Sequence, residues 1–170
     1  MKCYIIAEVG VNHNGSEEMA IKLIDAAVSA GADAVKFQTF KAELLVQKGA
    51  DKAEYQKKQT GSGDQFSMLK KLELSDDAHL RLSQYCKHKR IDFLSTGFDS
   101  KSIDMLLNLG MQRLKVPSGE LTNKPYIDYV VEKNIPIILS TGMADMHEVR
   151  EAVSWIKSHR DKLELRDPLA

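Results

Sequence analysis

The sequence predicts an α/β fold, a (β/α)8 TIM barrel that is incomplete and contains about the first five βα units. Short apolar runs alternate with helical periodicity, with strands starting near residues 4, 34, 91, 113 and 136. Successive βα units imply a parallel sheet with right-handed crossovers. Two architectures fit this pattern: an open doubly wound sheet, or the first part of an eight-fold barrel. The absence of GxGxxG and GxxxxGK[ST] motifs weighs against the open nucleotide-binding sheet, and polar residues at strand ends favour the barrel.

The composition indicates one soluble globular domain, in which any anion site must be formed by a few placed side chains. The chain has 170 residues, of which 43% are hydrophobic and 28% charged, and Lys+Arg and Asp+Glu both total 24. A net charge of zero predicts no nucleic-acid or membrane partner. Cys3 and Cys86 lack zinc spacing and suit a reducing compartment. Without a membrane-length apolar run or a signal-type leader, we expect a cytoplasmic protein.

The first βα units are defined by apolar runs and helix signals. Residues 4–9 form a continuous apolar run, as expected of a strand buried on both faces. A helix should open at Asn14 or Ser16 and end at Gly31. Its predicted apolar face is Met19, Leu23, Ile24, Ala27 and Ala30. The second strand is expected at residues 34–38, and the long polar stretch 39–63 that follows suggests a functional connection such as a lid.

Capping signals mark the later helices. One helix should begin at Ser75, and another should open with Pro125 after Asn123. Asp145 with Glu148 predicts a capping box at the start of the last helix. The intervening strands are expected at residues 91–95, at the start of the stretch 113–120, where a short strand ends in the basic Lys115 before a turn, and at residues 136–140.

Polar side chains gather at the predicted carboxyl ends of these strands. Lys36 and Gln38 are two residues apart and therefore share one face of their strand. The whole group is Glu8, Lys36, Gln38, Ser95, Lys115, Ser118, Glu120 and Ser140. Two lysines on separate strands could neutralise a carboxylate and a phosphate on one small molecule, and Glu120 could orient a hydroxyl or move a proton.

Other interpretations of these residues remain open. Each lysine alone could be a solvated strand-end residue, and Glu8 a structural carboxylate paired with a lysine. Lys36 or Lys115 could instead be a Schiff-base nucleophile, although neither is set among residues that evidently lower its pKa. His13 is expected to shape its loop, whereas the four other histidines fall on predicted helices, where a solvated position is expected.

Four motifs, in order, resemble the N-acetylneuraminate (sialic acid) synthase family. They are IAEVGVNHNG at 6–15, GADAVKFQT at 31–39, KVPSGE at 115–120 and ILSTGM at 138–143. The resemblance spans residues 4–157 and implies a barrel transferase that condenses phosphoenolpyruvate with an open-chain N-acetylhexosamine, releasing phosphate. Legionaminic and pseudaminic acid synthases and spore-coat polysaccharide proteins share these motifs.

The resemblance also implies roles for individual residues. Lys36, Lys115, Ser118 and Ser140 would hold phosphoenolpyruvate, Gln38 and Glu120 would contact N-acetylmannosamine, and Glu8 would hold a water on a divalent metal, usually Mn²⁺. Glu8, Lys36, Lys115 and Glu120 are thus the expected catalytic residues. The full-length enzyme is expected to be a homodimer.

Two departures from the family pattern shape the expectation for this chain. The family's Ser-Thr-Pro-Phe motif reads Ser-Thr-Gly-Phe at 95–98, which predicts a more flexible turn at Gly97. Residues 1–170 are expected to form the N-terminal part of the barrel, without its later strands, its direct metal ligands and its antifreeze-like domain. We therefore expect little activity from the chain alone. The alternative is a non-catalytic half-barrel that pairs with another chain through its exposed strand edges.

Overall fold

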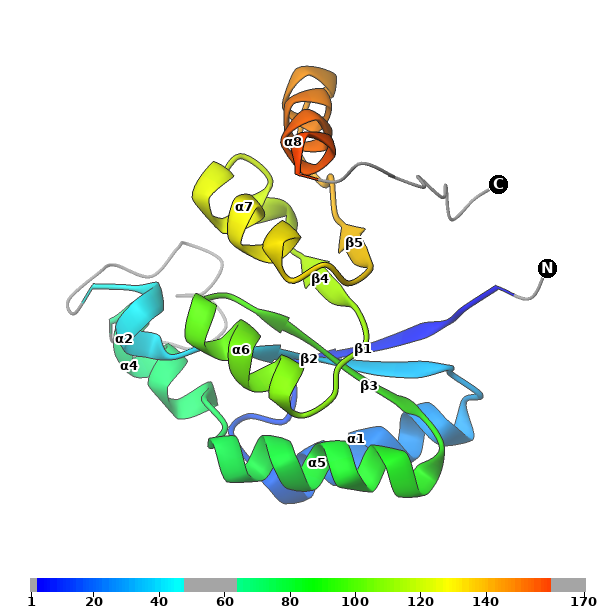
Figure 1. The fold of residues 1–170 in the computed structure, drawn as a ribbon. Coiled ribbons are helices and arrows are strands. Elements are labelled where there is room, and N and C mark those ends of the chain that lie inside the picture. Colours follow the sequence, from blue (N-terminus) through cyan, green and yellow to red (C-terminus); the bar gives the residue numbers. More distant parts are fainter. Residues whose placement is uncertain (1–2, 48–63, 160–170) are drawn as a thin grey trace.

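The computed structural model describes residues 3–47 and 64–159 as alternating parallel strands and helices (Figure 1). The strands are β1 (Ile6–Gly10), β2 (Ala34–Thr39), β3 (Asp92–Gly97), β4 (Leu114–Val116) and β5 (Ile137–Leu139). The helices are α1 (Glu17–Ser29), α2 (Ala42–Leu45), α4 (Gln65–Leu72), α5 (Asp76–Lys89), α6 (Ser100–Asn108), the 3-10 turn η1 (Ser118–Glu120), α7 (Lys124–Glu132) and α8 (Met146–Ser158). The predicted order of five βα units is confirmed.

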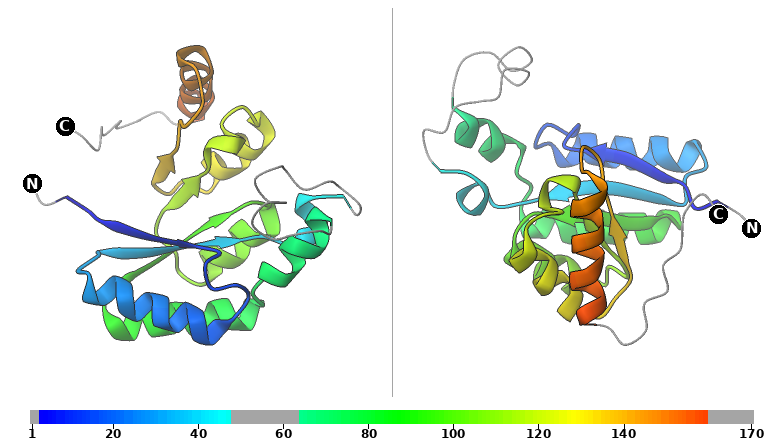
Figure 2. Two further views of the ribbon diagram at one scale, coloured as in Figure 1. Left: turned by 180° about the vertical axis from the view of Figure 1, so that it is seen from behind. Right: turned by 90° about the horizontal axis from the view of Figure 1, so that it is seen from above.

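The strands form two parallel sheets in sequential order. One contains β1-β2-β3 and the other β4-β5, and β4 packs beside β3. Neighbours in space are therefore neighbours in sequence, which is the order of a barrel and not that of a doubly wound sheet. The described residues form a partial barrel, with α1 and α5 together on one side of the larger sheet (Figures 1 and 2).

Three apolar clusters hold the layers together. The first joins Val35 and Phe37 of β2 to the inner faces of α1 and α5. The second packs β3 and β4 against α6 and α7, and the third joins α7 to α8. Because alternate residues of a strand face opposite sides, burial of Val35 and Phe37 under helices turns Lys36 and Gln38 to the barrel's inner side.

Helix signals in the sequence correspond closely to the observed caps. The side chains of Ser16, Ser75 and Asn123 accept hydrogen bonds from the first turns of α1, α5 and α7. Asp145 forms the predicted capping box on α8. Gly31 follows α1 with φ +76°, a conformation that favours glycine at a helix end.

Some local expectations are wrong. Met19 is 41% exposed, because the buried face of α1 is formed by Ala20, Ile24 and Ala27. The stretch 39–63 was expected as one long connection, but α2 begins within it at Ala42, and α4 follows at Gln65. The rest of that connection, residues 48–63, lies outside the described residues. None of the helices described is both long and apolar enough to cross a membrane.

Candidate active site

Glu8 and Lys36 form the centre of the polar group on the inner side of the sheet. They are paired residues of the parallel strands β1 and β2, and the Lys36 ammonium forms an ion pair with the Glu8 carboxylate. Lys36 is only 8% exposed, and its Nζ also donates to Thr96 Oγ1 at 3.5 Å. Because an unpaired buried ammonium is costly, the ion pair with Glu8 offsets the burial of Lys36.

Lys115 approaches the same centre from β4. Its Nζ donates to the Ser140 hydroxyl and to the Val116 carbonyl oxygen, the latter at 3.0 Å. Burial, and secondarily the Lys36 charge, lower the pKa of Lys115, whereas the Glu8 charge opposes this shift. The expectation that neither lysine is in a pKa-lowering setting is therefore wrong for Lys115. Two partly desolvated ammonium groups share the field of one carboxylate.

Two glycines lie close to Ser118 and Gln38. A Cβ added to Gly142 would lie 3.7 Å from Ser118 Oγ, which places the Ser118 hydroxyl against the turn after β5. A Cβ at Gly10 would lie 3.4 Å from Gln38 Nε2 and 3.5 Å from Glu8 Oε1. Gly10 has φ +56°, and it leaves room for both side chains where β1 ends.

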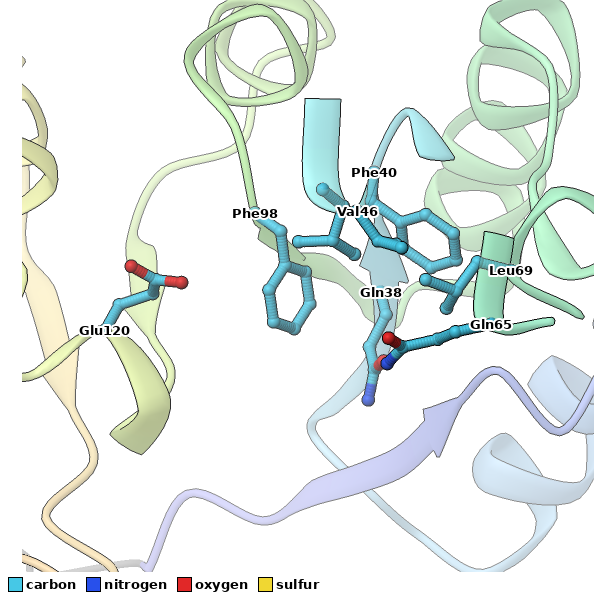
Figure 3. Close-up of a pocket in the computed structure, with 8 residues that line it drawn as sticks. Gln38, Phe40, Val46, Gln65, Leu69, Phe98 and Glu120 are labelled. Carbon is cyan, nitrogen blue, oxygen red and sulfur yellow. The ribbon is translucent and has the colours of Figure 1, made fainter. Parts of the chain in front are cut away.

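A pocket of about 340 Å³ opens between the end of β2 and the turn η1. Gln38 and Glu120 both line it, so the structure brings together the two residues predicted to contact the sugar. The other lining residues are Phe40, Leu45, Val46, Gln65, Leu69 and Phe98. Figure 3 shows Glu120 on the opposite side of Phe98 from Gln38 and Gln65. Its carboxylate accepts a hydrogen bond from Asn123 Nδ2 at 2.6 Å.

Ser95 does not belong to this group, contrary to the sequence-based expectation. It pairs with Phe37 in the β2–β3 register and therefore faces the helix layer, whereas Thr96, opposite Gln38, faces Lys36. The Ser95 hydroxyl is buried and lies 2.6 Å from Thr39 Oγ1. A shift of one residue in the pairing of two strands turns every side chain of a strand to the opposite face. The sequence alone did not show whether Ser95 or Thr96 pointed inward.

A buried histidine, His79, joins Thr39 and Ser95 in a second polar cluster on the helix side of the sheet. His79 was expected on a solvated helix face but is 2% exposed, with Nε2 2.8 Å from Thr39 Oγ1 and Nδ1 2.9 Å from the Ser75 carbonyl oxygen. A carbonyl only accepts, so Nδ1 carries the proton and Thr39 donates to Nε2. Burial lowers the pKa of His79, which agrees with a neutral ring.

His13 shapes its loop as predicted, because its Nδ1 accepts a hydrogen bond from the Gly15 amide at 3.0 Å. The ring is fully buried beside Phe37, and burial lowers its pKa.

Gly97 is held tightly, so the expectation of a flexible turn is wrong. It is a buried residue at the end of β3, and its carbonyl accepts a hydrogen bond from the Tyr126 hydroxyl. A Cβ at this position would lie 2.9 Å from Ile103 Cγ1 and 3.1 Å from Ile103 N. A larger residue would force Ile103 to shift, because β3 and the first turn of α6 approach closely here.

Sequence reasoning missed Thr96 and the apolar wall of the pocket. Phe40 and Phe98 follow β2 and β3 and meet edge to face, with ring centroids 6.4 Å apart. Each directly follows an observed strand and lies two or three positions beyond the predicted strand end. An aromatic residue at two neighbouring strand ends is the signal that could have indicated this wall.

Most of the chain matches a family model. Residues 23–166 match the model of the NeuB family. The chain belongs to the NeuB family. It is 54% identical over 160 residues to the N,N'-diacetyllegionaminic acid synthase of Legionella pneumophila, covering 94% of this chain and 45% of that protein. The chain thus spans about half the length of this curated relative.

Solved structures support the same relationship. A sialic acid synthetase from Leptospira borgpetersenii superimposes with a TM-score of 0.80 at 30% identity, over 94% of this chain and 51% of that one. The spore coat polysaccharide biosynthesis protein SpsE of Bacillus subtilis superimposes with a TM-score of 0.73 at 38% identity, over 92% of this chain and 41% of that one. These two proteins therefore resemble this chain in fold as well as in sequence.

Proposed function

We propose that this chain supplies the phosphoenolpyruvate-binding part of a NeuB-type synthase. The reaction condenses phosphoenolpyruvate with N-acetylmannosamine, or a related N-acetylhexosamine, to a nonulosonic acid and phosphate in surface-carbohydrate biosynthesis. The observation that carries the proposal is that Lys36 and Lys115, on different strands, are near enough to affect each other's charge, and that one carboxylate, Glu8, acts on both. This leaves one positive charge in excess, which suits the phosphate and carboxylate of phosphoenolpyruvate.

The proposed roles of the residues follow from their chemistry. Lys36 and Lys115, with the hydroxyls of Ser118 and Ser140, hold the enol phosphate and carboxylate. Carbon three of the enol attacks the aldehyde of the sugar, water adds at carbon two, and the C–O bond to phosphate then breaks. Gln38 and Glu120 orient the sugar, since both line the pocket beside this group.

A divalent metal, proposed as Mn²⁺, would polarise the sugar aldehyde, with Glu8 holding one of its waters. Within residues 3–47 and 64–159, no three His, Cys, Asp or Glu side chains are grouped to hold a metal ion. Glu8 is committed to Lys36. The described residues therefore do not fit a metal site by themselves, and the steps above use only protein groups.

Phosphoenolpyruvate binding and turnover test the proposal separately. Isothermal titration of the 170-residue chain should show phosphoenolpyruvate binding that Lys115→Met reduces at least about tenfold, as expected for loss of a charged hydrogen bond of 1.5–3 kcal/mol. Lys124→Met, at an exposed lysine of α7, is the matched control. Manganese-dependent phosphate release is expected from the complete gene product, and little from this chain alone. Failure of both binding and release would refute the proposal.

The lowered pKa of Lys115 keeps one alternative chemistry open to test. A Schiff-base aldolase would use Lys115 as a nucleophile. Borohydride reduction in the presence of pyruvate would then add a covalent mass at Lys115, whereas the proposed synthase adds none. Pairing of half-barrels, the non-catalytic alternative, predicts a stable dimer of this chain in ultracentrifugation. A homodimer is also proposed for the full-length enzyme.

We also propose an acceptor sugar and a location in the cell. We favour an N-acetylhexosamine of the legionaminic acid type over the sialic, pseudaminic and spore-coat types, because the Legionella relative is 54% identical. A cytoplasmic location suits an enzyme that consumes phosphoenolpyruvate.

A further inference from the structure

The capping residue of α7 makes two different hydrogen bonds with one side-chain amide. Asn123 precedes the helix, and its Oδ1 accepts a hydrogen bond from the Tyr126 amide at 3.3 Å. Its Nδ2 donates to Glu120 Oε2 at 2.6 Å. A backbone amide only donates and a carboxylate only accepts, so these two partners fix the orientation of the Asn123 side chain. The cap of α7 thus also holds a carboxylate that lines the pocket.

The residue type at this cap suits the second contact. Other helices of the chain are capped by serine or aspartate, namely α1, α4, α5, α6 and α8 by Ser16, Asp64, Ser75, Asp99 and Asp145. Of the described helices with a side-chain cap, α7 is the one that uses asparagine. An aspartate would cap the helix equally well, but it has no N–H to donate to a carboxylate. Asparagine supplies the oxygen for the helix and the donor for Glu120 together.

The first turn of α7 is fixed to the end of β3, so the Asn123 amide has a defined position. The Tyr126 hydroxyl donates to the carbonyl oxygen of Gly97, and the next residue, Phe98, lines the pocket. Ile127 is 1% exposed, and its amide donates to the Asn123 carbonyl oxygen at 3.0 Å. Glu120, by contrast, has a long side chain whose rotamer freedom is lost when it is ordered. The helix therefore offers a rigid support to a flexible carboxylate.

We infer that Asn123 is a positioning residue of the sugar site, which orders the Glu120 carboxylate beside the pocket before the substrate binds. The inference rests on the proposed function, in which Glu120 orients the sugar, and it adds the residue through which the fold controls Glu120. A side chain that is already ordered has no further rotamer freedom to lose on binding. That advantage corresponds to about a two- to twelvefold gain in affinity.

Asn123→Asp separates the two contacts of the cap. The aspartate keeps an oxygen for the first turn of α7 but replaces the donor by a second carboxylate facing Glu120. The melting temperature should therefore stay within about 2 °C of that of the parent. In the 170-residue chain saturated with phosphoenolpyruvate, the calorimetric affinity for N-acetylmannosamine should fall by about two- to twelvefold. Asn134→Asp is the matched control, because it makes the same change at an exposed asparagine beyond the other end of α7.

A double-mutant cycle with Glu120→Ala shows whether Asn123 acts through Glu120. Once the carboxylate is removed, Asn123→Asp should cause no further loss of affinity for the sugar. A merely structural role would give the same loss in both backgrounds, or a loss only where the melting temperature also falls. If Asn123→Asp does not fold, Asn123→Ser retains a capping oxygen and removes the amide donor.

The outcomes separate this inference from the proposed function. Absence of phosphoenolpyruvate binding would count against the function itself. If phosphoenolpyruvate binds but N-acetylmannosamine does not, the inference falls together with the role of Glu120 in the sugar site. If both bind, the inference is overturned by a folded Asn123→Asp protein with the sugar affinity of the parent, or by an equal loss of affinity in the Glu120→Ala background.

Discussion

Gly97→Ala is the substitution for which the structure gives the most definite expectation. The new Cβ would lie 2.9 Å from Ile103 Cγ1, 3.1 Å from Ile103 N and 3.3 Å from Ile103 Cα. Two of these atoms are backbone atoms of α6, so a change of the Ile103 rotamer would relieve the shortest contact and leave the two backbone contacts. Overpacking of this kind costs about 1–3 kcal/mol. At about 2–4 °C per kcal/mol for a chain of this size, the melting temperature should fall by about 2–12 °C.

Thermal unfolding followed by circular dichroism measures this effect. Gly119→Ala is the matched control, because a Cβ at Gly119 meets no atom within 4 Å and the same substitution changes the unfolded chain equally. Phe98 follows Gly97 directly and lines the pocket, so Gly97→Ala should also weaken sugar binding. A Gly97→Ala protein that melts within about 1 °C of the parent would show that the strand–helix contact is not tight, and the reasoning would fail.

Three further predictions concern titration and capping. Burial holds the pKa values of His79 and His13 below 6.5 in the folded state, so the unfolded state binds more protons below that pH. The free energy of unfolding measured in urea should therefore fall from pH 7.5 to pH 5.5, and it should fall less steeply in His79→Gln. The same slope in His79→Gln and the parent would contradict this. Asp145→Ala should cost about 1 kcal/mol of unfolding free energy through loss of the α8 cap, and exposed Ser154→Ala on the same helix should cost much less. Because the pKa of Lys115 is lowered, the calorimetric affinity for phosphoenolpyruvate should begin to fall at a lower alkaline pH than an ordinary lysine would cause. In Lys115→Arg the affinity should change less with pH, because arginine stays charged. The same alkaline loss in both proteins would refute the role of Lys115.

The sequence allowed most of the fold to be predicted, since local signals specified it. Alternation of apolar runs with helical periodicity located all five βα units, and Ser16, Ser75, Asn123 and Asp145 marked helix starts that the structure confirms. The helix α4 was not predicted. It is only eight residues long, and none of its residues is buried.

The candidate site was predictable only in part. The two-residue spacing of Lys36 and Gln38 placed them on one face of β2, as observed. The same reasoning failed for Ser95, because the position of each strand relative to its neighbour decides which alternate residues point inward. In the observed register Thr96, and not Ser95, lies beside Gln38.

The sequence by itself determined the order of elements, their caps and the residue types at the strand ends, because these depend on neighbours a few positions apart. Only the tertiary structure decided that Glu8 pairs with Lys36, that burial lowers the pKa of Lys115, and that His79 is enclosed behind β2. The tertiary structure also joined Phe40 to Phe98 as the wall of the pocket. The physical reason is that desolvation and charge pairing depend on distances between residues far apart in the chain, which packing of the strands and helices sets.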